Sequence, residues 1–222
     1  MKNKALFKKS FAYDWPLYVV LPLVAGFSLS YLLNVIHQPK AYEKLNVFVA
    51  STKIESGAFC KDIEEKFHDN GLKEVTAVQS NPNDALFAQK LNVVGYEGSD
   101  LFLLPESVLK SINPSDIMVP FNAELEKNYV TENAPVYYVS EGDSYGVRIK
   151  EKSVSHWLSS YIEFLDEDYY LCLNIKSKNI ASYGLYSSES YDLALKAFVY
   201  LQGGAAWRTP RKPVLRRLKA KR

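Results

Sequence analysis

The 222-residue chain has few of the residues that build metal sites, disulfide scaffolds or catalytic centres. Its two cysteines are far apart in the sequence, which excludes a disulfide-rich scaffold and a cysteine zinc site. Its three histidines, His37, His68 and His156, are scattered and form no H-x-x-x-H pattern. Neither a phosphate-binding glycine loop nor a Gly-x-Ser-x-Gly motif occurs. We therefore predict no catalytic residues, no metal and no cofactor, and a protein that is not an enzyme.

Charged side chains are unevenly distributed, although the formal net charge is only +2. Residues 1–14 contain four lysines and one aspartate, whereas residues 208–222 contain eight basic residues and no acid. The rest of the chain holds 15 basic and 24 acidic residues. A nucleic-acid-binding domain needs a basic face, so this acidic middle excludes nucleic acid as an expected partner. With 47% hydrophobic residues, the chain can bury a core.

The run from Trp15 to Ile36 contains no charged side chain. As a helix it spans ~33 Å, enough for a ~30 Å hydrocarbon core. Trp15, Tyr18 and Tyr31 lie toward its ends, where aromatic rings favour the membrane interface. We predict a transmembrane helix that contacts membrane lipid. A cleaved signal peptide is the alternative, but the run is longer than such segments and no small-residue cleavage site follows it, which favours an uncleaved signal anchor.

Four lysines precede this run and place the N-terminus in the cytoplasm by the positive-inside rule. The predicted localisation is therefore the cell membrane, crossed once, with the C-terminal domain extracytoplasmic. The expected organisation is a cytoplasmic N-terminus (1–14), a transmembrane signal anchor (15–36), a linker (37–44), an extracytoplasmic domain (45–202) and a basic tail (203–222). Three interpretations of the tail are open: an arm for an anionic surface, a disordered end, or a non-native extension that begins at Gly203.

Strand-like and helix-like segments alternate from Leu45 onward. Apolar or alternating runs predict strands, and the four-residue spacing of Phe59, Ile63 and Phe67 predicts a helix that ends at Gly71. Three successive βα units indicate an α/β domain with a mostly parallel sheet. The expected strands are 45–51, 74–80, 100–104, 136–140, 145–150 and 169–175, and the expected helices are 57–70, 83–92, 105–112, 154–164 and 189–201.

Several of these segments carry a resemblance. The runs NVFVAS, EVTAVQS, SDLFLLPESVL, SYGVRIK and DYYLCLNIKSKN, followed by a helix of the type DxALKxxxxL, look like an extracellular solute-binding domain of the type 2 periplasmic-binding class. The resemblance is to small membrane-anchored versions from Gram-positive bacteria and covers residues 45–202. It implies a periplasmic-binding-like α/β domain that binds a sugar, amino acid or peptide reversibly. Such proteins usually have two full lobes, and this domain is shorter.

The candidate ligand-binding residues come from position and residue type. Ser51 and Thr52 follow the first strand, and ligands bind at the carboxyl edge of parallel sheets. Aromatic faces stack on sugar rings or cap apolar ligands in such clefts, which adds Tyr96, Trp157 and Tyr183. Each of these aromatics has ordinary packing as its alternative explanation.

Cys60 and Cys172 could form a disulfide outside the cell, but two small buried hydrophobic residues explain them equally well. The predicted function is non-catalytic binding of a ligand or partner by a membrane-anchored, solute-binding-like domain. The alternative is a structural or interaction subunit of a cell-envelope or transporter complex, in which the binding cleft has been lost.

Overall fold

The computed structural model describes residues 2–131, 135–180, 183 and 192–203, and it divides into two units at Lys40/Ala41. The first unit is helix α1 (Lys2–His37), whose segment Val19–His37 has a mean hydropathy of 2.0 and is unburied. Among the described residues, this is the helix that is long and apolar enough to cross a membrane. The predicted basic tail lies outside the described residues, except for Gly203.

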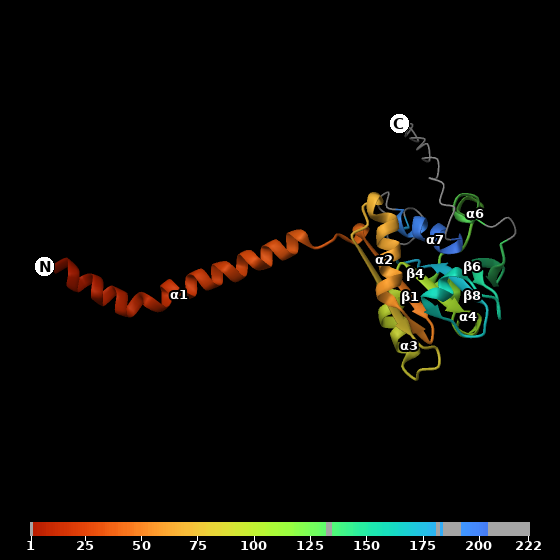
Figure 1. Cartoon of the computed structure of the whole chain (residues 1–222), viewed down its shortest axis with the longest axis horizontal. Helices are drawn as coiled ribbons and strands as arrows, with labels where there is room; N and C mark the ends of the chain where they lie inside the picture. Colours follow the sequence, from red (N-terminus) through yellow and green to blue (C-terminus); the bar gives the residue numbers. More distant parts are fainter. Residues whose placement is uncertain (1, 132–134, 181–182, 184–191, 204–222) are drawn as a thin grey trace, which may run out of the picture. The chain divides into compact units, whose positions relative to one another are not determined.

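A six-stranded sheet forms the centre of the second unit (Figure 1). Its strands, in spatial order, are β3 (Glu74–Ser80), β1 (Lys44–Ala50), β4 (Leu101–Pro105), β8 (Tyr169–Leu173), β6 (Asp143–Lys150) and β5 (Tyr137–Ser140). A two-stranded ribbon of β2 (Lys53–Ile54) and β7 (Ile162–Glu163) lies beyond β1 along the chain. The predicted strands therefore exist, with bounds shifted by one or two residues.

The predicted mostly parallel sheet is wrong. Strand β1 is parallel to β3 and β4, but the pairings β4–β8, β8–β6 and β6–β5 are all antiparallel. The three βα units account for the parallel part only. The later hairpin is antiparallel by its connectivity, and β8 inserts between β4 and β6 with the opposite direction to both. Hydrophobic periodicity predicts where strands form, but it does not indicate which strands lie side by side in the sheet.

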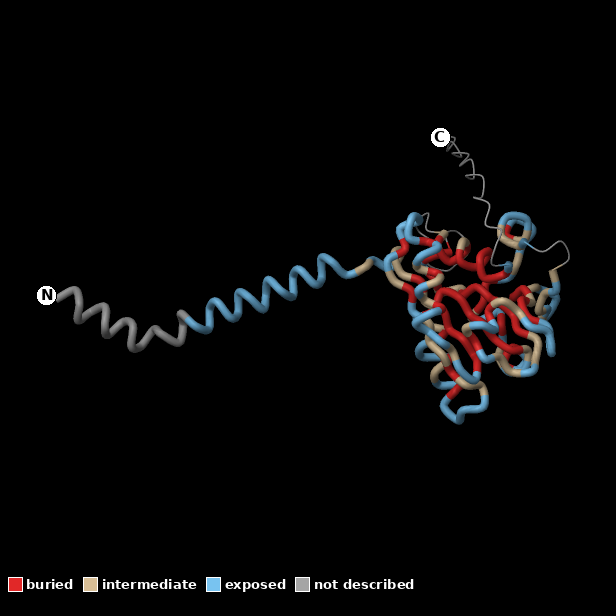
Figure 2. The backbone as a smooth tube through the Cα atoms, in the orientation of Figure 1, coloured by how far each residue is buried: buried red, intermediate tan, exposed pale blue. Residues whose placement is uncertain are grey.

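Side chains alternate between two cores on opposite faces of the sheet. Val47 and Val49 of β1 face the first core, whereas Phe48 and Ala50 face the second. Helices α2 (Ser56–Phe67) and α7 (Leu193–Gly203) cover the first face. The second face is covered by α3 (Phe87–Lys90), the π-helix η3 (Leu91–Tyr96) and α4 (Glu106–Ser111). Figure 2 shows the buried residues concentrated in the sheet and along the inner sides of these helices.

The first predicted helix is confirmed in its details. Phe59, Ile63 and Phe67 are each about 1% exposed or less, so their four-residue spacing buries one face of α2. The short helix η2 (His68–Asn70) follows, and Gly71 ends it with a φ of 86°. That left-handed conformation costs glycine little, which is why a glycine stands there.

The predicted helix over 154–164 is wrong. Only the single turn η4 (Trp157–Ser160) forms, and β7 follows it. His156 begins the turn, and its Nδ1 atom accepts the N–H of Leu158. The backbone of Ile162 pairs with Ile54 instead of continuing a helix. Tertiary pairing with the β2 segment therefore overrides a local apolar pattern.

The remaining elements connect the sheet to its helices. The strands predicted over 136–140 and 145–150 form a hairpin. Its turn is the two residues Glu141-Gly142, shorter than the four residues between the predicted strands. Both turn residues have positive φ, as tight hairpins with a two-residue loop require. Three further short helices are η1 (Ala41–Glu43), α5 (Pro114–Ile117) and α6 (Ala123–Tyr129).

Candidate functional site

The carboxyl edge of β1, where Ser51 and Thr52 lie, is closed by the chain itself. Ser51 is fully buried, its N–H donates to Ser80 O at 3.1 Å, and its hydroxyl donates to Lys53 O at 3.2 Å. The side-chain amide of Gln79 donates to the carbonyl oxygens of both Ser51 and Thr52, at 2.5 and 3.2 Å. The polar groups of Ser51 are therefore used within the fold.

Thr52 is exposed, but its backbone is also engaged, because its N–H donates to Glu163 O at 3.1 Å. This bond joins the carboxyl edge of β1 to the β2–β7 ribbon. Ser80 lies beside Ser51, and its buried Oγ atom has no hydrogen-bond partner within the described chain. Thr52 is thus the predicted residue of this edge that remains exposed to solvent.

The aromatic candidates lie in three different places. Trp157 packs edge-on against Tyr200, with ring centroids 5.4 Å apart, and contributes to the first core. Tyr183 packs against Tyr129, and burial raises the pKa of Tyr183 to about 12. Tyr96 ends η3, before β4 begins, so it lies at the amino edge of the parallel strands. The structure therefore does not bring the five predicted residues into one cleft.

A cavity of about 230 Å³ lies at the amino edge of β1 and β4, beside Ala41. We call it the tether-side cavity, because Ala41 is four residues beyond the end of α1 in the chain. Its polar lining includes Asn46, Asp100, Ser177 and Asn179. Three lysines also line it: Lys44, Lys176 and Lys178.

Asp100 is the buried acid of this cavity, at 6% exposure. Its Oδ2 atom accepts the N–H of Asn46 at 2.9 Å, and its Oδ1 atom accepts the hydroxyl of Ser177 at 2.5 Å and the amide of Asn179 at 3.1 Å. Burial raises the pKa of the Asp100 carboxyl, and the three donors oppose this rise by stabilising the carboxylate. The carboxyl is thereby held in place by two separate chain segments, the start of β1 and the run 177–179.

Asn179 connects this acid to the first residues of the domain. Besides Asp100, its side-chain amide donates to Ala41 O at 3.1 Å and to Lys44 O at 3.0 Å. Its backbone carbonyl accepts the N–H of Ala194 at the start of α7. Through its side-chain amide and its backbone carbonyl, Asn179 therefore joins the segment before β1, Asp100 before β4 and the last helix.

Asn174 has a related role on the other side of Asp100. Its buried amide donates to Ser99 O at 2.6 Å and Tyr96 O at 2.9 Å, which holds the end of η3. Next to it, Lys176 lies 3.9 Å above the ring of Tyr96 and pairs with Glu97. The hydrogen bond that Lys176 donates to Glu97 raises the pKa of Lys176. Of the predicted site residues, Tyr96 therefore lies nearest the cavity in the chain: it does not line the cavity but contacts Lys176, which does.

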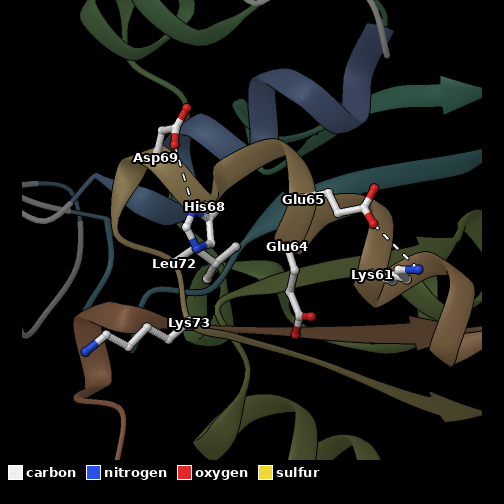
Figure 3. A pocket seen from close by; sticks show the side chains of 7 residues that line it. All are labelled: Lys61, Glu64, Glu65, His68, Asp69, Leu72 and Lys73. Carbon is white, nitrogen blue, oxygen red and sulfur yellow. Dashed lines mark ion pairs between the residues drawn. The ribbon is translucent and has the colours of Figure 1, made fainter.

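A second hollow, of about 630 Å³, lies on the outer side of α2 and η2 (Figure 3). On its walls Lys61 pairs with Glu65 at 3.6 Å, and His68 lies 3.7 Å from Asp69. Glu64 points toward β3 and accepts the N–H of Val75. In the parts of the chain that the structure describes, no group of three metal-ligating side chains occurs here or elsewhere.

Cys60 and Cys172 are both free thiols. Cys60 packs against the first core, whereas Cys172 is fully buried in the second. Because the sheet separates the two cores, the thiols cannot approach each other without unfolding. Both cysteines therefore have packing roles, and burial raises the pKa of each.

The acidic turn before β8 has a structural role that is open to test. Asp168 accepts the N–H of Lys152 at 2.6 Å and pairs with Arg148 at 3.1 Å. Burial alone would raise the pKa of Asp168, but these two donors outweigh it and hold the pKa below the ordinary 3.8. Its stabilising contribution is therefore present above the unfolded-state pKa and is lost as the pH falls through the lowered folded-state pKa.

We expect Asp168→Asn to lower the free energy of unfolding by about 2 kcal/mol at pH 7. Urea denaturation at pH 7 and at about pH 3 measures this effect, and the difference from the wild type should shrink at the lower pH. Asp166→Asn is the matched control, since Asp166 is mostly exposed and its pairing with Lys152 spans 3.9 Å. Equal losses at both pH values would contradict this role for Asp168.

The residues that sequence reasoning missed are the buried amides and Gln79. Asn174, Ser177 and Asn179 all fall within the run NIKSKN, and Asp100 opens DLFLL. Polar residues next to an apolar strand give no sign of which distant carbonyls they meet. One signal was available: Tyr96 precedes a strand and Ser51 follows one, so they could not share an edge of parallel strands.

The chain was compared with protein-family models, with curated proteins and with solved structures, and nothing matches it in any of the three. What the fold and the site define is a mixed α/β domain preceded by one long apolar helix.

Proposed function

We propose that this is a single-pass membrane protein whose extracytoplasmic α/β domain binds a protein partner without covalent chemistry. It would act as an interaction subunit of a cell-envelope or transporter complex. The observation that carries the proposal is the closed carboxyl edge of β1. There, Ser51 is fully buried and its donor and acceptor groups are bonded to Gln79, Ser80 and Lys53.

The single sheet supports the same proposal. A solute-binding cleft of the expected kind lies between two lobes, and the described residues contain one six-stranded sheet and one small ribbon. The larger hollow, on α2, is lined by charged side chains, of which Lys61 and Glu65 pair with each other at the surface. Such a surface suits recognition by a polar protein face better than enclosure of a small solute.

Binding of a small polar solute is the second candidate, and the tether-side cavity favours it. The cavity holds about 230 Å³ and is lined by carboxylate, amide, hydroxyl and ammonium groups. Pockets for drug-sized ligands usually measure ~300–1,000 Å³, so this one would suit a smaller polar molecule. Tyr96 contacts Lys176, which lines it.

Thermal unfolding of the full chain in detergent, with sugars, amino acids and short peptides, separates the two candidates. A ligand that binds only the native state adds ~2.7 kcal/mol at a hundred times its Kd. We expect none of these molecules to raise the melting temperature. A saturable rise that Asn46→Ala removes would favour solute binding in the tether-side cavity, since the Asn46 amide lines that cavity and donates to Gly98 O at 2.9 Å.

The proposed topology has its own test. Lysines at positions 2, 4, 8 and 9 precede the apolar segment and support a cytoplasmic N-terminus. Protease added outside intact cells is therefore expected to digest the domain and leave the N-terminal end protected. Digestion only after the cells are opened would place the domain inside and contradict the proposal.

A further inference from the structure

The two edge strands of the sheet, β3 and β5, differ in how their outward backbone groups are hydrogen bonded. At the β3 edge, side chains of α2 accept hydrogen bonds from outward backbone N–H groups. Glu64 Oε1 accepts the N–H of Val75 at 2.9 Å, and the Cys60 thiol is hydrogen bonded to the backbone of Ala77. Another strand could not pair with β3 without displacing α2, so this edge is closed.

At the opposite edge, the backbone N–H and C=O groups of β5 that point away from β6 are not hydrogen bonded to the described chain. Arg148 N–H donates to Val136 O at 2.8 Å, so Val136 directs its backbone toward β6. Residues two apart in a strand face the same edge, so Tyr138 also faces β6, whereas Tyr137 and Val139 direct their N–H and C=O groups outward. Within the described chain, no hydrogen bond is made by these outward groups.

The side chains of this strand suit association rather than protection. Val139 is 60% exposed and Val136 is 41% exposed. Edge strands that avoid pairing usually carry a lysine or another charge, and residues 135–140 (PVYYVS) contain none. The strand is short, which limits pairing to a few residues and favours one register over open-ended aggregation.

We propose that β5 is the surface through which two copies of this chain associate, by antiparallel pairing of β5 with the β5 of a second copy. This proposal is independent of the function proposed above. Tyr137 and Val139 face outward, so a symmetric antiparallel pairing must set outward residues opposite outward residues. Placing Tyr138 opposite Tyr138 of the partner subunit does this for both. In that register the outward groups of Tyr137 meet those of Val139 of the partner subunit and exchange both hydrogen bonds.

Unpaired charges at the two ends of β5 agree with this register. Glu141 follows the strand in the turn, and in the described residues it makes no ion pair. Lys127 lines a hollow of about 480 Å³ together with Glu126, Pro135 and Tyr137 at the start of the strand, and it too forms no ion pair with the described chain. The register places Glu141 opposite Pro135 of the partner subunit and so beside Lys127 of the partner subunit. The two-fold axis repeats this contact at the other end.

A cysteine at position 138 tests the register directly. The two Tyr138 residues would form a non-hydrogen-bonded pair with Cα atoms ~4.5 Å apart, within the range for a disulfide. We expect the full-length Tyr138→Cys chain, in detergent and in native membranes, to cross-link to a dimer under mild oxidation. Val139→Cys is the matched control, because in this register its two copies lie too far apart to bond. The wild type controls for Cys60 and Cys172.

Val139→Pro then tests the edge itself. Proline removes an outward N–H that the pairing with β6 does not use, so the fold should keep its melting temperature. Added to Tyr138→Cys, it should lower cross-linking by ~tenfold, which corresponds to about 1.4 kcal/mol. Equal cross-linking of Val139→Cys and Tyr138→Cys, or undiminished cross-linking with proline, would overturn the proposal. So would a Tyr138→Cys chain that stays monomeric or cross-links only to a different protein.

Discussion

Asn179→Asp is expected to destabilise the domain by about 4 kcal/mol at pH 7, the range for an uncompensated buried charge. The side-chain amide of Asn179 donates to Ala41 O, Lys44 O and the Oδ1 atom of Asp100, all within 3.1 Å. A carboxylate in its place would present an acceptor oxygen to three acceptors. It would also put two buried carboxylates side by side, so one pKa of the pair must rise.

The pH dependence of Asn179→Asp follows from that rise. A carboxyl whose pKa is higher in the folded than in the unfolded state binds more protons when folded, so the free energy of unfolding falls as the pH rises through that window. The destabilisation should therefore be largest near pH 7 and should shrink toward about pH 4.5, where the pair takes up a proton. Urea denaturation at both pH values measures the difference.

Two controls separate the charge from the loss of hydrogen bonds. Asn179→Ala removes the donors without adding a charge, and we expect a loss of about 2 kcal/mol with no comparable pH dependence. Asn92→Asp makes the same chemical change at an exposed position of η3, where an effect within about 0.5 kcal/mol is expected. If Asn179→Asp were as stable as Asn92→Asp, the joining role of Asn179 would be wrong.

Gly146→Ala is expected to cost about 3 kcal/mol, because there is no room for a methyl group between β6 and β8. A Cβ atom at Gly146 would lie 2.5 Å from the Sγ atom of Cys172 and 3.3 Å from the Cβ atom of Tyr170. The backbone conformation of Gly146 suits any residue, so the cost comes from the clash alone. Cys172 is fully buried, so its Sγ atom cannot turn out into solvent without disturbing the core.

The thiol that causes the clash also provides the test. Cys172→Ala removes the Sγ atom and should recover most of the loss when combined with Gly146→Ala, so the two effects are far from additive. Chemical denaturation of the two single variants and the double variant measures this coupling. Gly57→Ala in α2 is the control, since nothing lies within 4 Å of its added Cβ atom and alanine favours a helix. Additive losses would refute the assignment of the clash to Cys172.

Local features of the fold were predictable because they depend on neighbours in the sequence. The spacing of Phe59, Ile63 and Phe67 defined the buried face of α2, and Gly71 marked the end of η2. The alternation of Glu74–Ser80 defined a strand with the observed bounds. The helix predicted over 154–164 failed because its apolar residues also suit a turn and a strand, and pairing with the β2 segment selects the strand.

The candidate site was far less predictable. Ser51 does follow β1 as expected, but its burial depends on Gln79 and on the ribbon that closes over it. Asp100, Asn174 and Asn179 are ordinary polar residues until β8 is placed beside β4. These partners lie more than 50 residues away in the chain, so no local pattern indicates them.

By itself, the sequence determined the long apolar helix, the positions of most strands and the α/β class, because hydrophobic periodicity and charge are properties of short windows. Tertiary structure alone decided the direction and place of β8, and with it the mixed sheet. It also decided that the Ser51 edge is closed, that a polar cavity lies at the opposite edge, and that the side of β5 away from β6 pairs with no strand of the described chain. These outcomes depend on which segments become neighbours, and that choice is made by the packing of both cores together.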